Sequence, residues 1–154
     1  MKKFLFIAAV SVLLFSCGKP KNYEQQKSDF IDVYALYQDY LDANQTCKTT
    51  IDVGIEFLNN DEFENSVKYK VCKDDMGEVT DVLAMRNGKF GELKNAVDVY
   101  QEKYSVGDIE KFEKYYAKDG GNCTLGEIND SLLNGGWVRE LADKYFDMYE
   151  GLLK

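Results

Sequence analysis

Three kinds of side chain in this sequence could do chemistry: cysteines, clustered carboxylates and tyrosines. The 154 residues include four Cys, 27 Asp and Glu and 11 Tyr, but no His. Without His the chain lacks the usual general base, the side chain that titrates near neutral pH and the commonest transition-metal ligand. We therefore expect no enzymatic activity, no catalytic residue, no metal site and no cofactor.

The carboxylates occur in two clusters along the sequence. The first is Asp61-Glu62 with Glu64, and the second is Asp74-Asp75 with Glu78 and Asp81. Such clusters could hold a cation or act as acid and base, but helices of acidic proteins carry them as solvated faces. We expect surfaces that attract or repel a partner's charges. A hydrolase is the enzymatic alternative, and it would need two close carboxylates buried in a cleft.

The segment Asp119–Thr124, with Glu127, invites comparison with a calcium-binding loop. An EF-hand needs oxygen ligands at alternating positions, Gly at the sixth position and an acid at the twelfth. Counted from Asp119, the third position is Gly121, the fifth is Cys123 and the sixth is Thr124. Because the pattern fails, we predict a plain interhelical loop.

The tyrosines are spread along the expected helices. Most should lie at the edge of the core with the hydroxyl group reaching water. A subset could instead line a groove for a glycan, a peptide or a partner helix, because aromatic surface gives affinity at low entropic cost. The possible binding surface comprises Tyr34, Tyr37, Tyr40, Tyr100 and Tyr104.

The element that should position most of these residues is the segment Tyr69–Tyr104. Apolar or aromatic residues recur every three or four positions, with Arg86 as the exception, which is the stripe of an amphipathic helix and resembles a coiled-coil seam. Glycines at three places and the alternation of Val67–Val71 allow other outcomes, namely two helices meeting near Asn87-Gly88 or a short initial strand.

The segment Tyr23–Leu58 has a matching stripe, interrupted at Asn44, and Asn59–Glu62 reads as the turn between two antiparallel helices. In such a hairpin, facing residues have position numbers with a constant sum. Pairing the two stripes around this turn gives sums of 119 or 120. The sequence therefore predicts a long antiparallel helical hairpin in this register.

The register places Cys47 and Cys72 at the same height on facing helices. In an oxidising compartment they are candidates for a disulfide, and two buried free thiols are the alternative. Cys123 has no His to activate it as a nucleophile. It could lie buried or pair with one of the other two cysteines.

Three shorter helices are expected in the last third of the chain, over residues 105–118, 124–133 and 137–152. Gly120-Gly121 should end the first, and the Thr124/Glu127 spacing is typical of a capping box at the start of the second. We expect these helices to cover the hairpin and bury Trp137. The fold class is all-α, a helical bundle.

The N-terminus has the pattern of a secretory leader. Lys2-Lys3 precedes a short apolar run that ends in Leu14-Phe15-Ser16-Cys17. This resembles the bacterial lipoprotein signal, in which the leader is cut before an invariant Cys that carries the lipid; Phe15 is bulkier than the usual residue there. An ordinary secretory signal that contains a Cys is the alternative. The resemblance implies a signal peptide at 1–16, lipidation of Cys17 and attachment to a membrane.

The resemblance and the composition together set the expected organisation. Residues 17–22 would be the lipidated cysteine and a short tether, and 23–154 a single α-helical domain. Gly18, in place of an acidic residue, favours the outer membrane where a cell has two. A net charge of −8 argues against nucleic acid as a partner.

From these features we expect a non-enzymatic module in the cell envelope that binds an envelope protein or polymer. The alternative is a carrier with a tyrosine-lined cavity for a small ligand.

Overall fold

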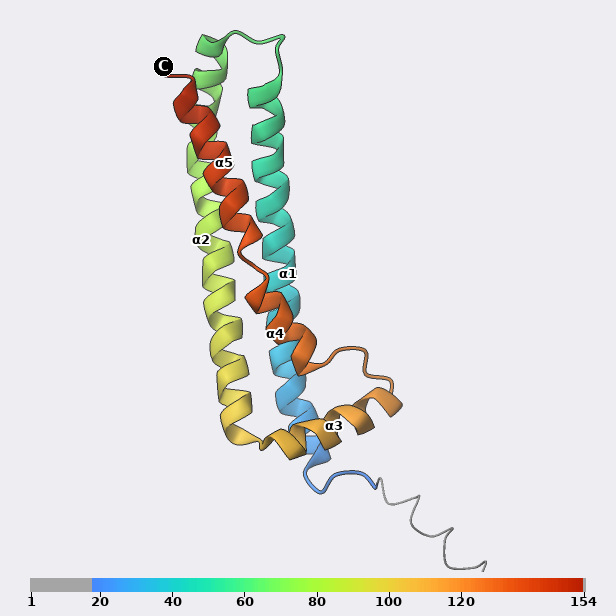
Figure 1. Cartoon of the computed structure of the whole chain (residues 1–154). Helices are drawn as coiled ribbons and strands as arrows, with labels where there is room; N and C mark the ends of the chain where they lie inside the picture. The colour runs from blue at the N-terminus through green and yellow to red at the C-terminus, as the bar shows by residue number, and fades with distance from the viewer. Residues whose placement is uncertain (1–17, 154) are drawn as a thin grey trace, which may run out of the picture.

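The computed structural model describes residues 18–153, and within them the chain forms five α-helices and no strand. The two long helices pack against each other as an antiparallel pair, and the three short ones lie against this pair (Figure 1). The predicted all-α helical bundle is therefore confirmed. The helices are α1 (Tyr23–Asn59), α2 (Asn65–Lys103), α3 (Val106–Lys118), α4 (Leu125–Leu133) and α5 (Trp137–Gly151).

The two long helices are each continuous. α1 has 37 residues and α2 has 39, so α2 contains the segment Val67–Val71 and passes through Asn87-Gly88 without a break. A Cβ atom added at Gly77, Gly88 or Gly91 would meet no neighbouring atom within 4 Å. These glycines therefore lower the helix propensity of α2 but interrupt nothing, because burial of the apolar stripe outweighs about 1 kcal/mol per glycine.

Helices α3 and α4 begin at the capping residues that the sequence predicts. The Ser105 side chain accepts a hydrogen bond from the Asp108 backbone at the start of α3. Thr124 and Glu127 form a reciprocal capping box at the start of α4. Gly120 has a φ of +90°, which only glycine adopts easily, and lets the chain leave α3.

The register of the hairpin differs from the predicted one. The rings of Phe30 and Tyr100 lie 5.8 Å apart and those of Tyr40 and Phe90 6.0 Å apart, and the position numbers of each pair add to 130. The expected sums were 119 or 120. The turn, Asn60–Glu64, is only one residue longer than predicted, but α2 begins beyond the end of α1, so the positions of α2 that face α1 lie further along the chain (Figure 1).

A shift of this size keeps the same faces together. About 11 residues correspond to roughly three helical turns at 3.6 residues per turn. Both registers therefore bury the same two stripes. Periodicity alone predicted which faces of the two long helices pack together, but it could not determine how far one helix is shifted along the other.

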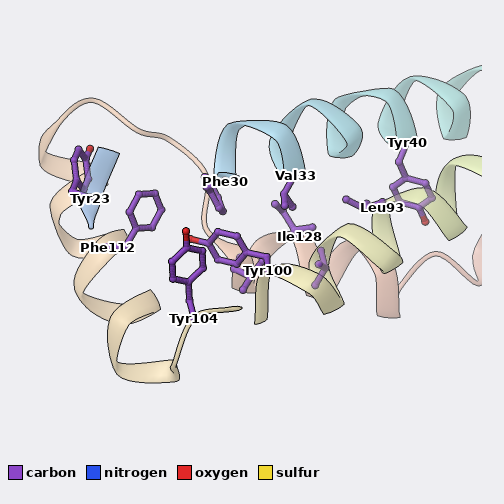
Figure 2. Close-up of a cluster of buried hydrophobic side chains, with 11 residues drawn as sticks. Tyr23, Phe30, Val33, Tyr40, Leu93, Tyr100, Tyr104, Phe112 and Ile128 are labelled. Atoms are coloured by element: carbon purple, nitrogen blue, oxygen red, sulfur yellow. The ribbon is translucent and has the colours of Figure 1, made fainter. Parts of the chain in front are cut away.

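The buried side chains form two separate cores. One lies at the end of the molecule near the start of α1 and includes Phe30, Leu93, Phe112 and Ile128 (Figure 2). The other lies toward the hairpin turn, where α5 packs mainly against α1, and includes Ile51 and residues of α5. The expectation that the short helices bury Trp137 was wrong, because its side chain at the start of α5 remains 40% exposed.

Candidate interaction site

The five tyrosines proposed as a binding surface do not form one. Tyr40, Tyr100 and Tyr104 are buried in the core of Figure 2. Their positions in the apolar stripes face the neighbouring long helix, so their side chains are buried between the helices. Tyr34 and Tyr37 are half-buried on α1.

Tyr34 and Tyr37 line a surface hollow of about 420 Å³ between α1 and the start of α4. The Tyr37 hydroxyl lies 2.9 Å from the Ser131 hydroxyl, which ties α1 to α4. The hollow also includes Cys123 and the carboxylates Glu127 and Asp130. The hollow is open and its lining is part polar and part apolar. The Glu127 carboxylate already accepts a hydrogen bond within the capping box of α4.

The predicted Cys47–Cys72 disulfide is absent, and both residues are buried free thiols. The register explains this. With facing positions adding to 130, Cys47 lies opposite Leu83 and Cys72 opposite Leu58, a separation of roughly 16 Å along the hairpin at 1.5 Å per residue. Bridged Cα atoms lie within about 7 Å. The alternative of two buried thiols is the one observed.

Cys123 is also a free thiol, and it is only partly buried. Burial, reinforced by the Glu127 carboxylate, raises its pKa to about 11. At neutral pH it is therefore protonated, whereas a nucleophilic cysteine needs its thiolate form.

The carboxylates among the described residues remain at least partly exposed, since the buried polar side chains there are Gln26, Asn44 and Lys68. Several of these carboxylates join helices, and two of them do so at the end opposite the turn. Asp119, after α3, accepts hydrogen bonds from Tyr23 and Lys27 of α1 at 2.8 and 2.6 Å. Asp29 accepts from Lys103 and Tyr104, which lower its pKa. These are structural contacts at the end opposite the turn.

Arg86 joins three segments in the middle of the molecule. Its Nε donates to Asn44 at 2.9 Å, and its Nη2 donates to the Tyr40 hydroxyl at 2.9 Å and to the Gly135 carbonyl at 2.7 Å. The two residues that interrupt the apolar stripes, Asn44 and Arg86, are therefore partners. Their pairing was the sequence signal that could have given the correct register.

A groove between α1 and α2 lies near the turn, and Tyr145 of α5 contributes to its lining. Its volume is about 460 Å³. Val53 and Val71 are exposed on its walls, Val53 to 61%, and Val79 is buried. The complete lining is Thr49, Thr50, Val53, Gly54, Phe57, Val71, Cys72, Asp75, Glu78, Val79 and Tyr145.

Tyr145 of α5 forms the floor of the groove. Its side chain is 1% exposed and belongs to the core near the turn. A Cβ atom at Gly54 would lie 2.6 Å from the ring, so only glycine lets the ring sit this close to α1. Helix α5 thus supports the groove from behind.

Exposed apolar residues continue from the groove toward the turn. The Phe57 and Phe63 rings lie 5.1 Å apart, and Val67 lies one helical turn before Val71 on α2. Phe63, Val67 and Val71 are each exposed. We call Val53, Phe57, Phe63, Val67 and Val71 the tip patch; together with the groove it is the candidate interaction surface of this structure. The sequence pattern did not reveal this patch, because Val67 and Val71 were interpreted as part of a possible short strand and the other three residues belong to neither apolar stripe.

Two further observations bound the site. No helix among residues 18–153 is both long and apolar enough to cross a bilayer. Within the same residues, no group of three Cys, Asp or Glu side chains is placed to hold a metal ion.

The leader and Cys17 lie outside the described residues. Comparison with known proteins found no matching family model, no similar curated protein and no similar solved structure.

Proposed function

We propose that this protein is a lipid-anchored, non-enzymatic module of the bacterial cell envelope that binds another envelope protein through the groove and tip patch. The observation that carries the proposal is this apolar surface, placed at the opposite end of the molecule from the proposed anchor. Anchoring through Cys17 remains part of the proposal, as does placement at the outer membrane.

The shape of the domain supports this assignment. The tether of residues 18–22 leads directly into α1 at Tyr23, whereas the turn lies at the far end of the hairpin (Figure 1). At 1.5 Å per residue, Thr49 and Phe57 lie roughly 40 and 50 Å along α1 from Tyr23. An anchor at Cys17 would thus lie at the opposite end of the molecule from the groove, which leaves the groove free to reach a partner.

The carrier alternative receives less support. A carrier needs a cavity that removes most of its ligand from water. The groove is open to solvent at the exposed Val53 and Val71, and the tyrosine-lined hollow is open and of mixed polarity.

In-cell photocrosslinking tests the proposal. A photoreactive amino acid would replace Val53 in the groove or, as a matched control, Val99 on α2, which is exposed to 54%. We expect the Val53 position to give one discrete adduct with an envelope protein in the lipidated protein, and neither Val99 nor a Cys17→Ala version to give it. Equal labelling from both positions would refute the proposal, and so would a co-purified small molecule in the groove by native mass spectrometry.

A further inference from the structure

We infer that the occupant of the groove is an amphipathic helix of the partner protein, with an apolar face about two turns long and Lys or Arg residues beside it. This inference rests on the proposed function and specifies the class of partner. It follows from the length, the lining and the charge of the groove.

The length of the groove fits a helix. On α1 the lining runs from Thr49 to Phe57, or about 12 Å at 1.5 Å per residue. Two turns of a helix cover that distance and present side chains at positions i, i+3 or i+4, and i+7 on one face. Three such side chains could lie over Val53, Val71 and the Tyr145 floor.

The lining provides apolar contact at the bottom and negative charge on one edge. Asp75 and Glu78 are exposed on the α2 side, while the α1 side carries the neutral Thr49 and Thr50. The eleven lining residues include no Lys or Arg. Basic residues beside the apolar face of the incoming helix would therefore be attracted to the α2 edge, and acidic ones repelled.

The charged residues of α2 around the groove also favour a basic partner helix. Lys68 is the nearest basic residue on the same face of α2, but its side chain is packed down to 6% exposure and is not part of the lining. Asp74 and Asp81 extend the acidic surface beyond the α2 edge.

A second copy of the chain fits poorly as the occupant. The chain has a net charge of −8, and its exposed helical faces carry many carboxylates. Bringing such a face onto Asp75 and Glu78 places like charges together, which costs binding free energy.

Two synthetic helical peptides would test the inference with the whole lipidated protein in non-ionic detergent. Both peptides have leucines at i, i+3, i+4 and i+7; one has lysines beside this face and the other glutamates. We expect the basic peptide to bind at least about 10-fold more tightly by fluorescence anisotropy, and added salt to reduce the difference.

Charge-reversed proteins would locate the binding site. Asp75→Lys with Glu78→Lys should reverse the preference, whereas Asp74→Lys with Asp81→Lys, an equal change in net charge outside the groove, should leave the basic peptide preferred. Val53→Asp should weaken both peptides while circular dichroism confirms that the helices remain.

The inference is overturned if Asp75→Lys with Glu78→Lys leaves the preference unchanged, if both charge reversals act equally, or if the Val53 crosslink joins two copies of this chain. If Val53 gives an adduct with an envelope protein but peptide affinity does not depend on Asp75 and Glu78, the proposed function is retained and this class of partner is rejected.

Discussion

At the scale of single residues, polar side chains hold the helices at defined heights. Arg86 is a cation whose hydrogen-bond acceptors are amide, hydroxyl and backbone oxygens. It also lies over the rings of Tyr40 and Phe90, 5.3 and 5.4 Å from their centroids. Such contacts demand one relative position of the helices, which the apolar stripes alone do not.

Gly135 provides a direct test of the Arg86 contacts. A Cβ atom there would lie 2.3 Å from the Tyr40 hydroxyl and 2.6 Å from Arg86 Nη2, whereas a Cβ atom at Gly136 would meet nothing within 4 Å. We expect Gly135→Ala to lower the free energy of unfolding by about 1–3 kcal/mol and Gly136→Ala to change it by less than about 0.5 kcal/mol. Urea denaturation measures both. Equal effects of the two substitutions would contradict the role assigned to Gly135.

Asp29 should make stability depend on pH. Hydrogen bonds from Lys103 and Tyr104 lower its pKa in the folded state below the ordinary 3.8. Its stabilising contribution is therefore complete above about pH 4 and is lost as the pH falls through the lowered pKa.

We expect Asp29→Asn to reduce the free energy of unfolding by about 1 kcal/mol at pH 7, because a partly exposed charged hydrogen bond is lost. The difference from the unsubstituted protein should shrink toward pH 3. Urea titrations at the two pH values would measure it, and a loss of equal size at both would show that Asp29 acts through packing rather than charge.

For the helices, the sequence predicted correctly which faces pack together and, within a few residues, where each helix begins and ends. It did not predict the height at which the two long helices face each other. The Ser105 and Thr124 caps and Gly120 act over three or four neighbouring residues, so the local sequence specifies them. The register depends on how the turn is built and on the distant Asn44–Arg86 contact. A periodic stripe is unchanged by three helical turns, and this is why its periodicity left the height undetermined.

The register has a consequence for the thiols. If Cys47 and Cys72 lie roughly 16 Å apart along the hairpin, oxidation cannot join them without unfolding. We expect the protein, unfolded without reductant and alkylated, to gain a label at each of Cys47, Cys72 and Cys123 by peptide mass spectrometry. Labelling of Cys123 alone would restore the disulfide and the original register.

At the scale of the whole molecule, the polar contacts of Arg86 separate two cores. Asn44, Arg86 and Gly135 fall between the core of α3 and α4 and the core of α5. The groove belongs to the second core through Tyr145. The sequence could not predict the groove, because its walls come from two helices whose predicted register was wrong and its floor comes from a third helix.

This division predicts that the halves open separately in hydrogen exchange, since contiguous packed units unfold as units. Ile51→Ala should cost about 2–5 kcal/mol in the core near the turn, and Leu93→Ala the same in the other. Ile51→Ala should therefore speed exchange mainly over residues 47–58, 72–83 and 137–151, and Leu93→Ala mainly over 23–40, 90–104 and 106–133. If either substitution sped exchange equally in both halves, the loss of stability would spread through α1 and α2, and the domain would unfold as one cooperative unit. Separate opening would leave the half near the start of α1 folded while the half with the groove adjusts to the proposed partner.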